Sequence, residues 1–228
     1  MTPKTKSSVE QTRNNLETGQ SVAVDAPLSL NLIARAAAAV NPQASWVLDI
    51  GCGAGNYTLK LLQSLPNLNV MLVDLSRPML DRAVQRIRQV SSGEILTARG
   101  DIRELPLGGL QFDIILAAAI FHHLRTDSEW RDVLAKCYAA LKPGGSIWIS
   151  DYIEHSIPGV QKVMWESYGE YLTMLKDKKL RDQVFALMEK EDTPRSVVYQ
   201  IDMLRAVGFK EAEIIHKNSC YAAFGAIK

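Results

Sequence analysis

The chain has 228 residues with 26 basic and 25 acidic side chains, which leaves a formal net charge of +1. That balance lacks the strong basic excess of a dedicated duplex-DNA binder. The longest uncharged apolar runs fall far short of the roughly 20 residues that a membrane-spanning helix needs, and the first residues have no apolar core of a secretory signal. The three cysteines show no close spacing, so we expect reduced, buried thiols in a single-domain (1–228), cytoplasmic protein.

From residue 45 onward, short apolar runs alternate with helix-type patterns. A continuous apolar run that ends at a turn signal is typical of a buried parallel strand. Alternation of such strands with helices favours a doubly wound α/β sheet. Strands are therefore predicted at residues 46–50, 69–73, 94–98, 112–117 and 146–150.

Helix signals lie between these strands. Ser76 can cap a helix whose apolar stripe runs from Leu80 to Ile87. Thr126 and Glu129 fit a capping box at the start of a second helix, and the Lys-Pro-Gly-Gly stretch at 142–145 marks its end.

The C-terminal part predicts a helix at 194–206 and two strands at 213–216 and 221–227. The short gap between these strands favours an antiparallel hairpin at the edge of the sheet. Two segments stand outside the alternation: an N-terminal extension at 1–44, with an alanine-rich helix at 28–40, and an insert at 156–193. Both are expected to be helical and to cover a substrate cavity at one end of the sheet.

The turn after the first strand, Leu-Asp-Ile-Gly-Cys-Gly-Ala-Gly at 48–55, carries the main functional signal. In open α/β sheets, ligands bind beyond the carboxyl ends of the strands, where the strand order reverses. Gly51, Gly53 and Gly55 allow unusual dihedral angles and a close approach of the backbone to a ligand. Their spacing is G-x-G-x-G, and Asn56 stands where the dinucleotide fingerprint needs its last glycine.

Two carboxylates follow the next two strands. Asp74 is placed to accept hydrogen bonds from the ribose hydroxyls of an adenosine, a contact that NAD also uses. Asp101 can accept from the exocyclic amine of adenine, and Ile102 can cover the face of the ring. These residues predict a nucleoside site without identifying the nucleoside.

In their order along the chain, these motifs resemble those of the class I S-adenosylmethionine-dependent methyltransferases. The matching stretches are LDIGCGAG, VDLS followed by PML, GDI with LP, FDIIL, FHHL and LKPGG, and the resemblance covers roughly residues 44–228. It implies a Rossmann-like seven-stranded sheet in the order 3-2-1-4-5-7-6, with strand seven antiparallel. The predicted C-terminal hairpin agrees with this order.

The resemblance also implies S-adenosyl-L-methionine as the cofactor. Asp49 would either contact the ammonium group of the cofactor or fix the amides of the loop. The implied cofactor-binding residues are Asp49, Gly51, Cys52, Gly53 and Gly55 around the methionine part, Asp74 and Leu75 at the ribose, Asp101 and Ile102 at the adenine, and Ala117 and Ala118 near the sulfonium.

His122 and His123 are the candidate catalytic residues, because they follow the fourth strand at the ligand-binding end of the sheet. A histidine can accept a proton at neutral pH. A base is needed only where the methyl acceptor must lose a proton; otherwise the protein mainly holds the acceptor in line with the S–CH3 bond. No zinc-type spacing links His122 with Asp151 and His155, so no metal is expected.

Three functions stay open. The neutral charge and the helical insert favour methyl transfer to a small molecule, with neither a membrane nor a nucleic acid as partner. The second function is methyl or carboxymethyl transfer to tRNA, because the C-terminal stretch from 203 onward is similar to bacterial tRNA uridine carboxymethyltransferases. Those enzymes need an arginine in the insert, where this chain has Phe185, with Arg181 one helical turn away. The third function is non-catalytic binding of an adenosyl cofactor.

Overall fold

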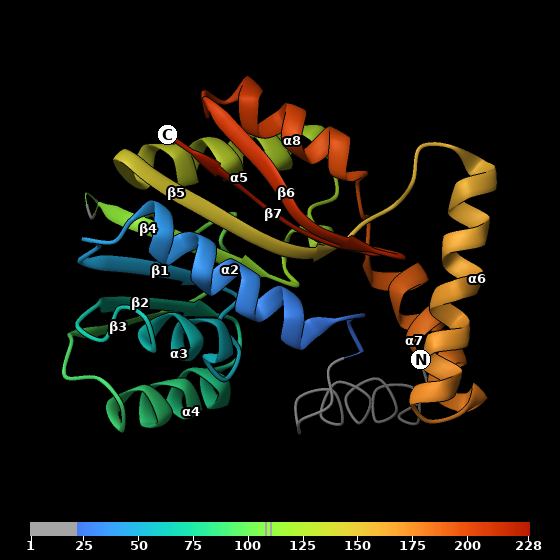
Figure 1. Ribbon diagram of the computed structural model, residues 1–228, viewed down its shortest axis with the longest axis horizontal. Helices are drawn as coiled ribbons and strands as arrows, with labels where there is room; N and C mark the ends of the chain where they lie inside the picture. The colour runs from blue at the N-terminus through green and yellow to red at the C-terminus, as the bar shows by residue number, and fades with distance from the viewer. Residues whose placement is uncertain (1–21, 108, 110) are drawn as a thin grey trace.

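A seven-stranded sheet organises the computed structural model, which describes residues 22–107, 109 and 111–228 (Figure 1). The strands lie in the order β3-β2-β1-β4-β5-β7-β6. Neighbouring strands are parallel from β3 to β5, and β7 is antiparallel to both β5 and β6. This confirms the predicted doubly wound, Rossmann-like fold. The strands are β1 (Trp46–Ile50), β2 (Asn69–Asp74), β3 (Ile95–Arg99), β4 (Phe112–Ala118), β5 (Leu141–Tyr152), β6 (Glu211–Asn218) and β7 (Tyr221–Ile227).

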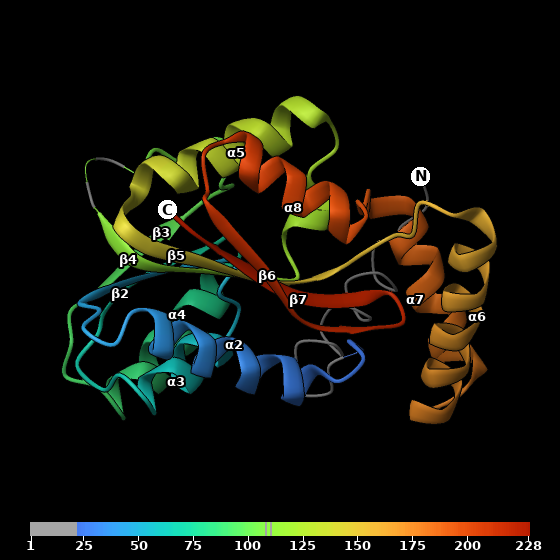
Figure 2. The same ribbon diagram turned by 45° about the horizontal axis from the view of Figure 1, so that its top comes forward.

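Helices cover both faces of the sheet (Figure 2). On one face lie α2 (Ala26–Val40), α3 (Asn56–Leu62) and α4 (Arg77–Arg88), which bury Ile33, Leu61 and Ile87 against the strands. On the other face lie α5 (Asp127–Ala140) and α8 (Val197–Ala206), where Trp130 and Leu204 belong to a second apolar core. The buried strands between these two layers explain the continuous apolar runs of the sequence.

Two helix starts show how local capping sets the element boundaries. The side chain of Thr126 accepts a hydrogen bond of 3.2 Å from the amide of Glu129, as the capping box predicts. The predicted start of the last helix at residue 194 is wrong, because Ser196 caps α8 and accepts from the amide of Tyr199. Side-chain capping therefore defines the first turn of both α5 and α8.

Two strands, β5 and β6, are longer than predicted by several residues. β5 begins at Leu141, directly after α5, rather than at residue 146, and Gly144 takes a φ of 77° where its register with β4 is irregular. β6 extends through Lys217 and Asn218, so the hairpin to β7 has a two-residue turn in which Ser219 has a φ of 49°. A hydrophobicity pattern does not reveal such strand ends, because backbone pairing does not require apolar residues.

The insert forms two helices, α6 (Pro158–Leu175) and α7 (Lys178–Glu191), which stand beyond the carboxyl end of β5 (Figure 1). They build a third apolar core, in which Tyr168 of α6 and Met188 of α7 pack with Tyr221 of β7. The expected N-terminal extension contains α2, whereas its residues 1–21 lie outside the described residues. No helix in the described part of the chain is both long and apolar enough to cross a membrane.

Candidate active site

The glycine-rich turn follows β1 at the carboxyl edge of the sheet. Gly51, Gly53 and Gly55 have φ values of 66°, 50° and 78°, in the left-handed region that side chains with a Cβ rarely adopt. The amides of Gly51 and Cys52 both donate to the carbonyl oxygen of Val73 in β2, at 2.8 and 3.0 Å. A Cβ placed on Gly53 would have nothing within 4 Å. At Gly53 the turn therefore presents bare backbone toward open space, which suits close contact with a ligand.

Asp74 lies at the end of β2 and links this turn to the next helix. Its Oδ2 accepts a hydrogen bond of 2.8 Å from the amide of Gly53, and its Oδ1 accepts one of 2.8 Å from the amide of Ser76. Leu75 beside it is 57% exposed, so an apolar surface is available next to the carboxylate. A half-buried carboxylate with an adjacent apolar side chain fits a ribose.

Asp49 and Cys52 are buried beneath the turn. Burial raises the pKa of the Asp49 carboxyl to about 7, although the hydroxyl of Thr58 donates to its Oδ2 at 2.6 Å. Burial also raises the pKa of the Cys52 thiol, which argues against a reactive thiolate at this position. Cys52, Cys137 and Cys220 are all free and buried, as expected from the sequence.

Asp101 follows β3 and is held by its neighbour Arg103. The guanidinium donates to both carboxylate oxygens, with Nη2 at 2.6 Å from Oδ2, and it also reaches Glu129 at 3.2 Å. The bonds to Arg103 lower the pKa of Asp101.

Ile102 is buried in the core, and its carbonyl oxygen accepts a hydrogen bond from the side chain of Lys136. The other two predicted residues, Ala117 and Ala118, end β4, the first buried and the second partly buried.

His122 and Asp151 form a close pair at the ends of β4 and β5. His122 belongs to the short helix η1 (Phe121–His123), and its Nδ1 is 2.5 Å from Oδ1 of Asp151. Asp151 is buried and also accepts from the backbone amides of Phe121, His122 and Tyr152. Burial alone would lower the pKa of His122, but the Asp151 carboxylate outweighs it and the pKa is raised. The geometry therefore fixes the orientation of the His122 ring.

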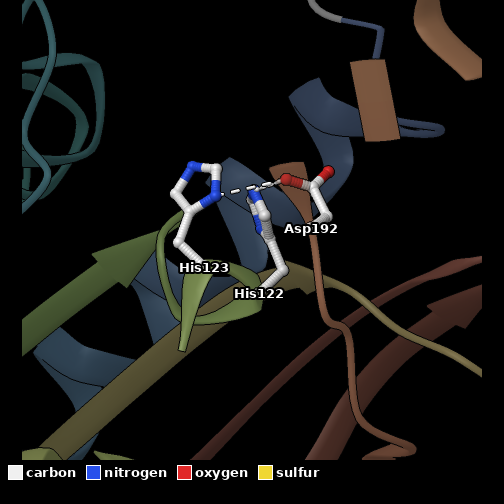
Figure 3. A group of neighbouring side chains, drawn as sticks. All are labelled: His122, His123 and Asp192. Carbon is white, nitrogen blue, oxygen red and sulfur yellow. Dashed lines mark ion pairs between the residues drawn. The ribbon is translucent and has the colours of Figure 1, made fainter. Parts of the chain in front are cut away.

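His123 contacts Asp192, a residue that no motif in the sequence marks. Its Nδ1 is 3.2 Å from Oδ1 of Asp192, the residue that follows α7, and Nε2 of His122 is 3.7 Å from the same oxygen (Figure 3). Asp192 lies far along the chain, in the insert, and follows a run of charged residues that gave no signal. His155 is engaged elsewhere, with Gln161 and Lys217.

The turn, the carboxylates and the histidines share one edge of the sheet. The position of a Cβ on Gly51 is 3.0 Å from the side chain of Ile120, which directly precedes η1. An electrostatic interaction between Asp101 and His123 indicates that these two residues also lie near each other. Fold and site together define a doubly wound α/β protein in which the glycine turn, the carboxylates and a histidine–aspartate cluster lie at the ligand-binding edge typical of such sheets.

Comparison with known proteins agrees with this description. Residues 47–145 match the family described as "Methyltransferase domain". The demethylmenaquinone methyltransferase of Lactococcus lactis is 26% identical over 172 residues, which are 73% of this chain and 66% of the relative. The uncharacterized methyltransferase of Anoxybacillus flavithermus is 34% identical over 105 residues, 46% of each chain. The matches thus span about half to two thirds of the length of these relatives.

Among solved structures, the human N-acetylserotonin methyltransferase in complex with SAM superposes with a TM-score of 0.58 at 20% identity, over 86% of this chain and 51% of its own. This similarity shows a shared fold. Residues 47–145 match a methyltransferase domain, and the strand order and the glycine-rich turn agree with the resemblance to the class I S-adenosylmethionine-dependent methyltransferases. S-adenosyl-L-methionine is the cofactor of this class, and the open backbone at Gly53 and the exposed Leu75 fit it.

Proposed function

We propose that this protein transfers the methyl group of S-adenosylmethionine to a small organic acceptor. One observation carries the proposal: the bare backbone of Gly53 and the carboxylate of Asp74 lie at the same edge of the sheet as the His122–Asp151 pair. In this proposal, the cofactor site and a polar acceptor site are adjacent. This adjacency supports catalysis over simple binding of the cofactor.

The cofactor supplies an electrophilic methyl group, so the chain need not supply a nucleophile. In the proposed complex, the turn at 51–55 holds the methionine part and Asp74 with Leu75 holds the ribose. Asp101 and Ile102 hold the adenine, which requires Asp101 to share its carboxylate with Arg103. Orienting the acceptor in line with the S–CH3 bond can contribute roughly 7–11 kcal/mol to lowering the barrier.

Where the methyl acceptor must lose a proton, we propose that His122 takes that proton as the general base. Asp151 fixes its Nδ1, which leaves Nε2 as the nitrogen that can take a proton. Such a base contributes roughly 10²–10⁴-fold to the rate. His123 has the same potential role through its contact with Asp192.

The small-molecule acceptor is supported by the relatives. Two of these proteins are named after demethylmenaquinone and N-acetylserotonin, which are small organic molecules. The carboxymethyl alternative is weakened by the insert, where Phe185 stacks on Trp165 with ring centroids 4.2 Å apart and Arg181 pairs with Asp182. A location in the cytoplasm remains a prediction from the reduced thiols.

The test is a product assay on the purified chain. We expect S-adenosylhomocysteine to be released with members of a library of hydroxylated and aromatic metabolites, and not with bulk tRNA. The Asp74→Asn variant should lose this release, whereas Asp81→Asn, which removes an exposed carboxylate on α4, should retain it. Release with tRNA alone would contradict the proposed acceptor class, and a protein that does not bind the cofactor would contradict the whole proposal.

A further inference from the structure

Three side chains with metal-binding donor atoms converge between η1 and the end of α7 (Figure 3). His122 and His123 come from η1, and Asp192 follows α7. One donor atom from each lies within 4.8 Å of the other two. We call these three residues the His-His-Asp cluster. An imidazole pair with one carboxylate is a ligand set of divalent transition metals.

The separations within the cluster suit a shared ion. Ligand atoms bound tetrahedrally at zinc distances lie about 3.4 Å apart, because each bond is about 2.1 Å long. The oxygen of Asp192 is 3.2 Å from Nδ1 of His123 and 3.7 Å from Nε2 of His122. These two values lie on either side of the expected separation. The third separation, between a ring nitrogen of His122 and one of His123, is at most 4.8 Å, so side-chain movements would bring all three atoms to one ion.

Asp151 supports the cluster through its contact with His122. In histidines that bind metals, the N–H of the second ring nitrogen usually donates a hydrogen bond to a carboxylate or a carbonyl, which fixes the ring and its tautomer. Nδ1 of His122 has this contact with Asp151. Three backbone amides hold Asp151 in turn, so its position is set by the fold. The lone pair of His122 Nε2 is thereby directed toward the cluster.

The charges also favour a cation. The side chains of Asp151 and Asp192 are 0% and 9% exposed, so two buried carboxylates lie in or beside the cluster. A divalent ion would neutralise them in a partly dehydrated environment. The side chain of His123 is 37% exposed, which leaves the cluster accessible from solvent.

We propose that His122, His123 and Asp192 bind one divalent transition-metal ion of the zinc class, with Asp151 orienting His122. This replaces the expectation of no metal, which considered His155 and Asp151 as ligands and could not foresee Asp192. Three protein ligands leave a further position for water or for an acceptor oxygen, as in catalytic zinc sites. The ion would also join the insert to the sheet, because its ligands come from both.

The assignment gives His122 a different role when the ion is bound. A ring nitrogen that holds a metal cannot also accept a proton. An acceptor hydroxyl at the open position would instead lose its proton more readily through the metal, as bound water does. This consequence rests on the proposed methyl transfer, whereas metal binding itself does not.

The test titrates Zn²⁺ alone into the purified 228-residue chain after removal of metals with a chelator. Calorimetry should show one ion per chain, and Co²⁺ should give the visible absorption of a four- or five-coordinate site. We expect Asp192→Asn to weaken binding at least 10-fold. Asp151→Asn should weaken it by roughly 10–100-fold, the effect typical of removing an outer partner of a ligand.

Matched controls separate this site from adventitious binding. Glu191→Gln removes the carboxylate next to Asp192, and His155→Gln removes an imidazole with other partners; both should bind Zn²⁺ within twofold of the wild type. Circular dichroism checks that each variant folds, and His123→Gln replaces Asp192→Asn if that variant does not. Absence of one-to-one binding, or equal binding by wild type and the ligand variants, would overturn the proposal and leave methyl transfer untouched.

Discussion

The carboxylate of Asp74 accepts a hydrogen bond of 2.8 Å from the backbone amide of Gly53, so the end of β2 holds the turn that follows β1. The same carboxylate accepts from the amide of Ser76 through its other oxygen. Because a carboxylate offers about four acceptor positions, two remain for the hydroxyls of a ribose. One side chain can therefore both shape the turn and bind the cofactor.

Asp74→Asn should weaken binding of S-adenosylmethionine. The substitution removes the charge and turns an NH₂ group toward one of the two amides that now donate to Asp74. Loss of one charge-assisted hydrogen bond costs about 1.5–3 kcal/mol, so the dissociation constant should rise by about 10-fold or more. Calorimetric titration measures this, with Asp81→Asn on α4 as the matched control. Unchanged affinity would refute the ribose-binding role of Asp74.

Gly55→Ala should destabilise the fold. Gly55 has a φ of 78°, and a Cβ there would stand 3.2 Å from the Cβ of Ala83 in α4. The left-handed conformation costs an alanine about 1–2 kcal/mol, and the close contact adds to it. Denaturant unfolding should show this loss, whereas Gly159→Ala, which has open space in α6, should be neutral or slightly stabilising. Equal stability of Gly55→Ala and wild type would show that the turn can rearrange.

The fold could be predicted because its signals are local or periodic. Apolar runs located β1 to β5, and Thr126 with Glu129 located the start of α5. The strand order came from the resemblance of motifs, since periodicity alone does not set neighbours in a sheet. The polar ends of β6 and the extended stretch at the start of β5 were missed because their backbone pairing leaves no apolar pattern.

The site could be predicted only in part. The glycine turn and Asp74 are marked by residue type at fixed distances from strands. Asp192 carries no such mark, because its contact with His123 depends on how the insert returns to the sheet after α7. The ion pair between Arg103 and Asp101 was not predicted from the sequence either, although the two residues are close along the chain. Tertiary contacts of charged side chains were the information that the sequence pattern lacked.

The stability of the protein should depend on the ionisation of Asp49. Burial raises the pKa of its carboxyl from 3.8 to about 7, so the folded state favours the protonated form. The stabilisation is fully present below the unfolded pKa and is lost as the pH rises toward 7. Relative to Asp49→Asn, the wild type should lose a few kcal/mol of unfolding free energy between about pH 4 and pH 7, because each pKa unit corresponds to about 1.4 kcal/mol.

Denaturant midpoints of both proteins across this pH range measure the difference. Asp113→Asn serves as a contrasting control, because the pKa of Asp113 is lowered through its bonds with Lys142 and two backbone amides. A flat difference between wild type and Asp49→Asn would show that Asp49 has an ordinary pKa in the folded protein.

Tyr168 should anchor the insert. Its side chain is fully buried, and its hydroxyl lies 3.1 Å from that of Tyr221 and 3.3 Å from the carbonyl oxygen of Val22. Tyr168→Phe should cost about 1 kcal/mol through the unpaired partner hydroxyl, and Tyr168→Ala about 3–5 kcal/mol through the cavity. Met174→Ala, an exposed position in the same helix, should change little. Comparable losses for Met174→Ala and Tyr168→Ala would contradict the assignment of Tyr168 to the core.

His122→Gln should slow methyl transfer without weakening cofactor binding. The imidazole is fixed by Asp151 and directs Nε2 away from it, so its loss removes either a base or a metal ligand from the acceptor side. With an acceptor that must lose a proton, kcat should fall by roughly 10²–10⁴-fold, and the dissociation constant of S-adenosylmethionine should stay within twofold. His216→Gln, at the far edge on β6, is the control. Full activity of both His122→Gln and His123→Gln would remove the cluster from catalysis and leave orientation of the acceptor as the main source of rate.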